Sequence, residues 1–83
     1  MSYGQILAIV QETINRHTIN KLNYDDVLLE YGIDSVSMIE IIIELEERFN
    51  IEFDPSALNY KLFKSIASIS KYIFRIISGE RYE

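Results

Sequence analysis

The sequence contains no cysteine, one proline, one histidine and three glycines among 83 residues. Without cysteine, neither a disulfide nor a thiolate metal site can stabilise the fold. The scarcity of proline, together with 48% hydrophobic residues, is typical of a globular chain and not of a disordered segment. Stability must therefore come from packed aliphatic side chains in one small domain. We expect that domain to span residues 1–83, with the last few residues forming a frayed tail.

Other absences narrow the function. No apolar run approaches the roughly 18 residues that a membrane span requires, and the N-terminus has no basic region or cleavage site of a signal peptide. We therefore expect a cytoplasmic protein without membrane insertion. The formal net charge of −5 disfavours nucleic acid and anionic lipid, and favours partners with basic surfaces.

The sequence also contains no obvious catalytic or metal-binding group of residues. It has no glycine-rich phosphate loop, and Asp25-Asp26 does not match a calcium loop, so a solvated turn is expected there. His17 lies where the first helix should end, which suits a cap better than base catalysis. These observations predict a chain that is not an enzyme and holds no metal.

Helix signals begin at the N-terminus, where Ser2 and Gln5 have the spacing of a capping box. They predict a helix from Tyr3 to Arg16, and a last helix is predicted after a cap at Ser65. Gly79 should end that last helix. The apolar stripes of these two helices are Ile6, Leu7, Val10 and Ile14, and Ile66, Ile69, Ile73 and Ile76 or Ile77.

The middle of the chain reads SVSMIEIIIELEERF from Ser35 to Phe49. Its alternating isoleucines and glutamates would also suit a strand, but the stretch is too long for a typical one. Glu44 and Arg48 have the spacing of a helical ion pair, and Ser35 is a good N-cap, so a helix is expected. The long link before it should be a partly ordered loop held to the core by residues 27–29.

Asp54-Pro55 predicts one more helix start, with a short helix around Ser56 to Asn59. The predicted fold class is therefore all-α. It is a small four-helix bundle with three main helices, one short helix, and a long loop after the first helix.

The helix from Ser35 has more apolar residues than one core stripe can use. Its core stripe is Met38, Ile41, Ile42, Leu45 and Phe49. A second, narrower stripe is bordered by carboxylates, and we call its six residues the acidic ridge: Val36, Ile39, Glu40, Ile43, Glu46 and Glu47. Such a ridge suits a partner that offers an apolar groove edged with Arg or Lys. The alternative is that the surrounding bundle buries both stripes.

Ser35 itself has two interpretations. As a helix cap it needs no further purpose. As an attachment point it offers a hydroxyl beside free backbone amides, where an esterified phosphate would be stabilised electrostatically.

The residues around Ser35 are Gly32-Ile33-Asp34-Ser35-Val36, followed by the acidic helix. This arrangement resembles the acyl and peptidyl carrier protein family, whose signature is Leu-Gly-x-Asp-Ser-Leu. Gly32, Asp34 and Ser35 match that signature, valine replaces its last leucine, and Tyr31 stands where leucine is more usual. The flanking helices also match, so the resemblance covers nearly the whole chain and implies the four-helix fold of that family.

The resemblance implies that Ser35 receives 4′-phosphopantetheine from coenzyme A through a phosphopantetheinyl transferase, which Asp34 contacts. The imported thiol would carry acyl groups as thioesters, which explains the missing cysteine. The implied function is an acyl carrier protein of fatty acid, polyketide or related secondary-metabolite biosynthesis, acting as a monomer. Its partners would be an acyl- or aminoacyl-loading ligase and downstream synthase enzymes with basic docking surfaces, which bind the acidic ridge.

Three alternatives remain open from the sequence. The chain could be a peptidyl or aminoacyl carrier of a nonribosomal-peptide or D-alanyl-carrier-like system. It could also be an unmodified helical interaction module that keeps the fold without the chemistry. A helix-turn-helix DNA binder is disfavoured, because its recognition helix would be the acidic one.

Overall fold

The computed structural model describes residues 1–79, and everything with regular structure in that range is helical. The elements are α1 (Tyr3–Asn15), the 3-10 turn η1 (Leu28–Tyr31), α2 (Ser35–Phe49), the 3-10 turn η2 (Pro55–Ala57), α3 (Tyr60–Phe63) and α4 (Ile66–Ile77). This confirms the all-α prediction of three main helices and one short one. The predicted frayed tail lies outside the described residues.

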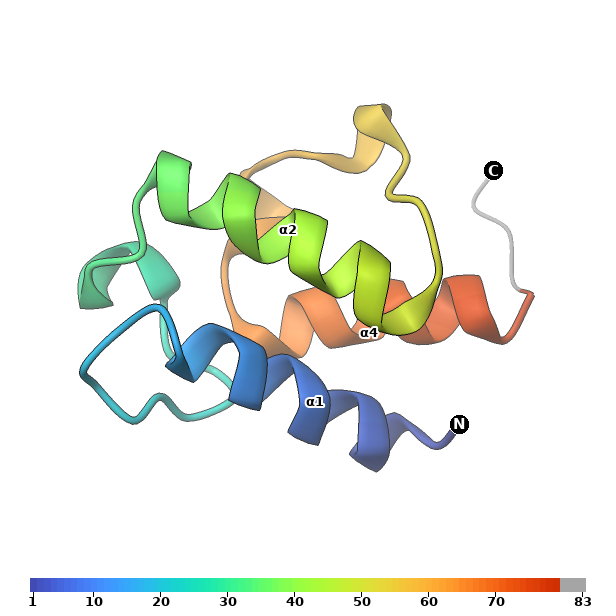
Figure 1. Cartoon of the computed structure of the whole chain (residues 1–83), viewed down its shortest axis with the longest axis horizontal. Helices are drawn as coiled ribbons and strands as arrows, with labels where there is room; N and C mark the ends of the chain where they lie inside the picture. The colour runs from blue at the N-terminus through green and yellow to red at the C-terminus, as the bar shows by residue number, and fades with distance from the viewer. Residues whose placement is uncertain (80–83) are drawn as a thin grey trace.

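The three long helices enclose one core. α1 packs along α4, α2 crosses above α1, and α3 leads directly into the first turn of α4 (Figure 1). The long link between α1 and α2 forms one end of the molecule, and α2 begins at that end (Figure 1). The N-terminal end of α2 is therefore placed away from the chain's N-terminus, beside the link that carries η1.

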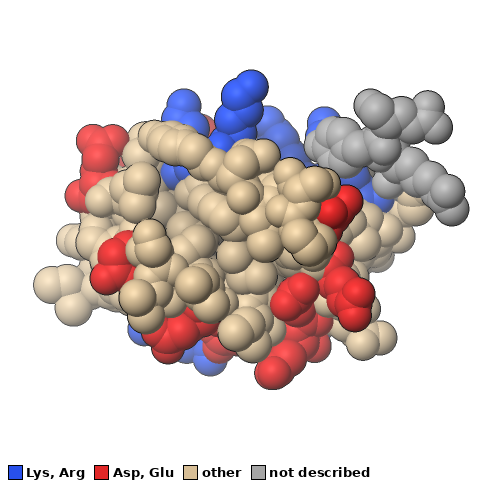
Figure 2. Space-filling view, turned by 90° about the horizontal axis from the view of Figure 1, so that it is seen from above, with Lys and Arg blue, Asp and Glu red and all other residues tan. Residues whose placement is uncertain are grey.

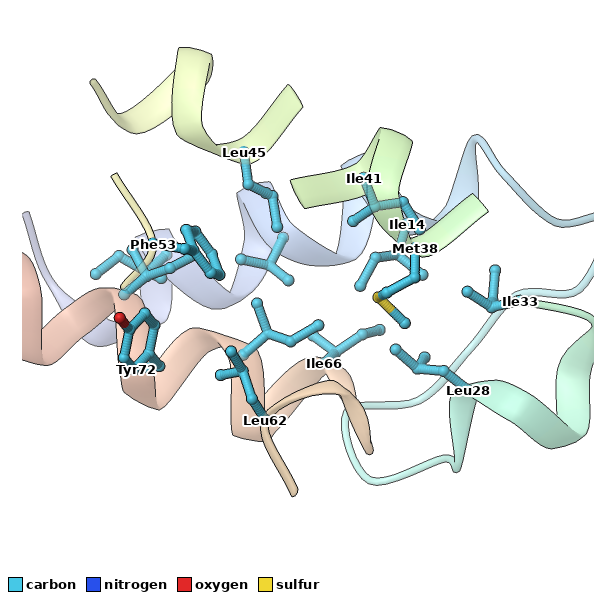
Figure 3. Packing of buried hydrophobic residues seen from close by; sticks show 14 of the residues in the cluster. Ile14, Leu28, Ile33, Met38, Ile41, Leu45, Phe53, Leu62, Ile66 and Tyr72 are labelled. Atoms are coloured by element: carbon cyan, nitrogen blue, oxygen red, sulfur yellow. The ribbon is translucent and has the colours of Figure 1, made fainter. Parts of the chain in front are cut away.

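Side chains from every long helix fill the interior. Met38, Ile41 and Leu45 reach down from α2 towards Ile66 and Leu62, which come from the α3–α4 side (Figure 3). Leu28 and Ile33 enter the same core from the link before α2 and are fully buried (Figure 3). The prediction that apolar residues hold this link to the core is thus confirmed for Leu28, whereas Leu29 is exposed.

The ends of α1 and α4 follow the sequence signals. Ser2 and Gln5 form the predicted capping box, and Ser65 caps α4 by accepting a hydrogen bond from the Ser68 amide (3.1 Å). α1 ends at Asn15, one residue before the predicted end. Gly79 follows α4 with a φ of 77°, a left-handed conformation that glycine adopts without strain.

The segment between α2 and α4 differs from its prediction. A helix over Ser56–Asn59 is wrong, because Asp54 and Pro55 start only one 3-10 turn. Asn59 then takes an extended backbone and caps a new helix, accepting the Leu62 amide on Oδ1 (3.2 Å). Asparagine is among the best N-caps, so α3 begins just where the predicted helix was to end.

The predicted Glu44–Arg48 pair within α2 is replaced by ion pairs between helices. Glu44 binds Arg16 at 2.7 Å, and Arg48 binds Glu12 at 3.1 Å and donates to the Thr13 hydroxyl at 2.8 Å. The sequence spacing placed both residues on one face of α2 correctly. That face of α2 lies against α1, so both side chains form ion pairs there. These ion pairs hold the two helices together.

Two polar residues that were predicted to have no catalytic or metal-binding role make local contacts in the fold. His17 follows the end of α1, with its Nε2 3.5 Å from Glu44 Oε2. Asp26 Oδ2 accepts the Asn23 amide at 2.7 Å, which stabilises a turn in the long link. Within residues 1–79 no group of three or more His, Asp or Glu could hold a metal ion, and no helix is long and apolar enough to cross a bilayer.

Candidate functional site

The backbone before α2 is shaped by Gly32 and Ile33. Gly32 ends η1 with a φ of 84°, a left-handed conformation that costs other residues free energy. Ile33 is fully buried and anchors the turn from below. The chain therefore emerges from the core and delivers the next residues, Asp34 and Ser35, to the surface.

The N-cap of α2 is Asp34, so the prediction that Ser35 caps this helix is wrong. Asp34 has an extended backbone, and its Oδ1 accepts the Ser37 amide at 2.8 Å. Asp is as good a cap as Ser, and only one of two adjacent residues can occupy the position. Hydrogen bonds from the backbone and side chain of Ser37 hold the pKa of the Asp34 carboxyl below its usual 3.8. The carboxylate is therefore ionised at neutral pH.

Ser35 becomes the first residue of α2 and is exposed. Because Asp34 supplies the cap, the Ser35 hydroxyl forms no hydrogen bond with any residue in the range 1–79. It lies at the positive end of the helix dipole, where a covalently attached phosphate would be stabilised. The structure thus leaves this oxygen accessible and chemically uncommitted.

An apolar groove of about 350 Å³ starts at Asp34 and Ser35. One wall is α2, through Met38, Ile39 and Ile42, and the other is the α3 side of the molecule. Residues of that second wall include Leu58, Tyr60, Phe63 and Lys64. This second wall was not predicted from the sequence. The cluster of aromatic and aliphatic residues in LNYKLF was the signal that could have indicated it.

The apolar part of the acidic ridge is exposed. Val36 is 67% exposed, Ile39 59% and Ile43 51%, whereas Ile41 and Leu45 on the core side are fully buried. The interpretation that the bundle buries both stripes is therefore wrong. The core stripe is confirmed except at Ile42, which is only partly buried because it lines the groove.

The three glutamates of the ridge differ from one another. Glu40 and Glu47 are exposed, while Glu46 is partly buried and its Oε2 accepts the Phe53 amide at 2.8 Å. Glu46 thus fastens the link after α2 to the helix. Figure 2 shows acidic residues at the left, lower and right sides of this face, and Lys and Arg mostly along its upper edge, with others at the lower left.

Because only Glu46 forms this hydrogen bond, substitutions at Glu46 and Glu47 should affect the free energy of unfolding differently. Glu46→Gln should lower the free energy of unfolding by about 1 kcal/mol, because a neutral amide accepts the Phe53 hydrogen bond less strongly than a carboxylate does. Glu47→Gln, which changes the charge equally, should leave it unchanged. Urea denaturation of both variants provides the measurement, and equal stabilities would show that Glu46 has no structural role.

Comparison with known proteins gives this geometry its context. Residues 4–73 match the family described as "Phosphopantetheine attachment site". The chain belongs to this family of carrier proteins. Its prosthetic group is 4′-phosphopantetheine, and the exposed Ser35 hydroxyl, the helix N-terminus and the adjoining groove fit such a group.

Two curated relatives have similar sequences. The carrier protein is 35% identical over 49 residues to an aminoacyl carrier protein of Agrobacterium fabrum, a match that covers 59% of each chain. It is also 35% identical over 54 residues to an acyl carrier protein homolog of Mycoplasmopsis pulmonis, covering 64% of this chain and 74% of that relative. The match with the Agrobacterium protein thus spans less than two thirds of that protein's length.

Two solved structures share the fold. One is the glycylated carrier protein bound to a Bradyrhizobium japonicum glycine:[carrier protein] ligase, with a TM-score of 0.68 and 16% identity over 83% of this chain and 95% of that one. The other is a holo acyl carrier protein from Nitrosomonas europaea, with a TM-score of 0.70 and 22% identity over 92% and 95%. At these identities the likeness establishes the fold alone.

Proposed function

We propose that Ser35 carries the 4′-phosphopantetheine of this protein, and that the chain is a non-catalytic carrier of acyl intermediates. The main observation in support is that Ser35 is exposed at the N-terminus of α2. Its hydroxyl neither caps the helix nor forms a hydrogen bond with another described residue. In the attachment step the Ser35 oxygen bonds to the phosphorus that bears the pantetheine arm of coenzyme A, and the pyrophosphate bond of coenzyme A breaks. The leaving group is 3′,5′-adenosine bisphosphate, and the hydroxyl proton passes to a base of the transferase or to water. The thiol of the bound group then holds cargo as a thioester.

Asp34 has two roles in this proposal. Its carboxylate caps α2 and so releases Ser35 from that task. Because its pKa is lowered, it also presents a fixed negative charge beside the attachment point, which favours a transferase with a basic surface.

The proposal includes a cellular setting and a set of partners. The protein acts as a monomer in the cytoplasm, in fatty acid, polyketide or related biosynthesis. Its partners are a phosphopantetheinyl transferase, a loading ligase and downstream synthases. The arm raises the local concentration of cargo at each partner's active site, so docking need only be weak and brief.

Intact-mass measurement tests the proposal. The purified protein, incubated with coenzyme A and a broad-specificity phosphopantetheinyl transferase, should gain the mass of one phosphopantetheinyl group. No gain would favour the unmodified interaction module instead.

An aminoacyl carrier is the second candidate for the cargo. Similarity to the Agrobacterium aminoacyl carrier protein favours it, whereas the apolar groove beside Ser35 favours an acyl group. The intact mass of the protein isolated from its own cells distinguishes the two, because the thioester-bound groups differ in composition.

We further propose that the acidic ridge is the transferase-docking surface. Glu40→Lys/Glu47→Lys should lower kcat/KM for modification about tenfold at low salt, because charges at the edge of an interface act on association. Both residues are exposed, so the fold should be unaffected. Asp25→Lys/Glu30→Lys changes the net charge equally at exposed positions in the link before α2 and is the control. Equal rates for the two double variants would remove Glu40 and Glu47 from the docking surface.

A further inference from the structure

Three lysines of this acidic protein lie in α3, directly after α3 and in α4. Lys61, Lys64 and Lys71 are exposed and form no ion pair with any residue from 1 to 79. By contrast, Arg16 and Arg48 are engaged by carboxylates across the α1–α2 contact. We call Lys61, Lys64 and Lys71 the basic strip.

The strip begins at the attachment site. Lys64 lines the same groove as Ser35 and lies on the wall opposite α2. Lys61 and Lys71 line a second cleft, of about 780 Å³, on the α3–α4 side. Figure 2 shows Lys and Arg gathered mostly along the upper edge of the face, while acidic residues lie at its left, lower and right sides. Charges of opposite sign thus border the groove at Ser35.

Acidic residues near the strip do not cancel it. Glu52 and Asp54 also line the second cleft. The Asp54 carboxylate accepts hydrogen bonds from the amide and hydroxyl of Ser56, both at 2.9 Å, and is committed to its turn. Glu52 is the other exposed carboxylate that lines this cleft within residues 1–79, and Lys61, Lys71 and Arg75 line it as well.

Apolar side chains accompany the lysines. Leu58 is 41% exposed and Tyr60 is 56% exposed, and both line the groove beside Lys64. An exposed aromatic side chain can anchor a partner, and charges at the rim around it orient that partner. The α3 side therefore resembles the acidic ridge in that exposed apolar side chains lie beside charged ones, but its charges are positive.

We infer that the basic strip, with Leu58 and Tyr60, is a second docking surface that takes an acidic surface of the loading enzyme. This inference rests on the proposed function. An enzyme that receives the arm at Ser35 meets the acidic ridge on one side of the groove and the strip on the other. A cognate enzyme then presents basic residues to α2 and acidic residues to α3, and a uniformly basic partner is repelled at Lys64.

Two other occupants fit the strip less well. An anionic membrane would be repelled by the net charge of −5 and by the ridge that borders the same groove. A second copy of the chain, bound with its ridge on this strip, would match it in charge, but this head-to-tail contact builds rings or filaments and not the monomer proposed above.

The first test uses a short poly-L-glutamate peptide as the probe and needs no modification of Ser35. Titrated into the isotope-labelled full chain at low salt, it should shift the amide resonances of Tyr60–Lys64 and Lys71. Lys64→Glu should weaken binding about fivefold, and the control Lys21→Glu, with the same charge change in the long link, less than twofold. Shifts outside the strip, or equal losses in both variants, would overturn the inference.

The second test uses the ligase that loads the holo protein. Lys64→Glu should raise KM about fivefold and leave kcat unchanged, whereas Lys21→Glu should leave both unchanged. An unaltered KM for Lys64→Glu overturns the inference, as does cosedimentation with phosphatidylserine vesicles or a dimer that Lys64→Glu abolishes. Failure of the proposed function differs, because the mass gain would then be absent while the poly-L-glutamate shifts persist.

Discussion

Ser35→Ala is expected to abolish the mass gain with coenzyme A and transferase completely. The substitution removes the oxygen that would form the phosphodiester bond, so no residual activity should remain. The helix should be unaffected because Asp34, and not Ser35, caps α2. Circular dichroism of the variant should therefore match that of the unaltered protein, which separates a loss of chemistry from a loss of structure.

Ser37→Ala is the matched control for this experiment. Ser37 lies two residues further along the same helix. The change removes the contact of its hydroxyl with the Asp34 carboxylate, but the hydrogen bond from its backbone amide, which caps the helix, survives. Its variant should be modified at the normal rate. A mass gain that persists in Ser35→Ala, or one lost only in Ser37→Ala, would contradict the assignment of Ser35.

Ile41→Ala is expected to destabilise the fold by about 3 kcal/mol, because it removes a fully buried side chain and leaves a cavity. For a domain whose total stability is of the order of 5–15 kcal/mol, this is a large fraction. Urea denaturation should show a lower midpoint with little change in the slope.

Ile43→Ala removes the same atoms two residues away on α2 and provides the control. Ile43 is 51% exposed, so its truncation should change the free energy of unfolding by less than about 0.5 kcal/mol. Similar losses in the two variants would show that the ridge is part of the core. The contrast matters for function, since a residue that the fold does not need is available to a partner.

The helices α1 and α4 were predictable because the sequence patterns that specify them are local. A capping box at Ser2, a cap at Ser65 and apolar residues at helical spacing each act within a few residues, and the structure confirms them. The start of α2 was harder to predict. Asp34 and Ser35 are both good caps, and the choice depends on how Gly32 and the buried Ile33 orient the backbone before them.

Partners of charged side chains were less predictable still. The spacing of Glu44 and Arg48 fits an ion pair within α2, yet Arg48 binds Glu12 of α1 and Glu44 binds Arg16, which directly follows α1. Glu46 was predicted to be a surface charge, whereas its carboxylate accepts a hydrogen bond from the Phe53 amide. Such contacts depend on which helix or link lies alongside, and single-sequence spacing contains no information on that.

By itself the sequence determined the three long helices, the apolar content of the core, the acidic charge and the motif around Ser35, because these follow from residue types and short-range spacing. Only the tertiary structure decided that the second apolar stripe stays exposed and that Ser35 is free of the capping role. It alone also placed Leu58, Tyr60 and Lys64 across a groove from α2. The reason is geometric, since burial and the walls of a groove depend on packing between segments distant in the chain.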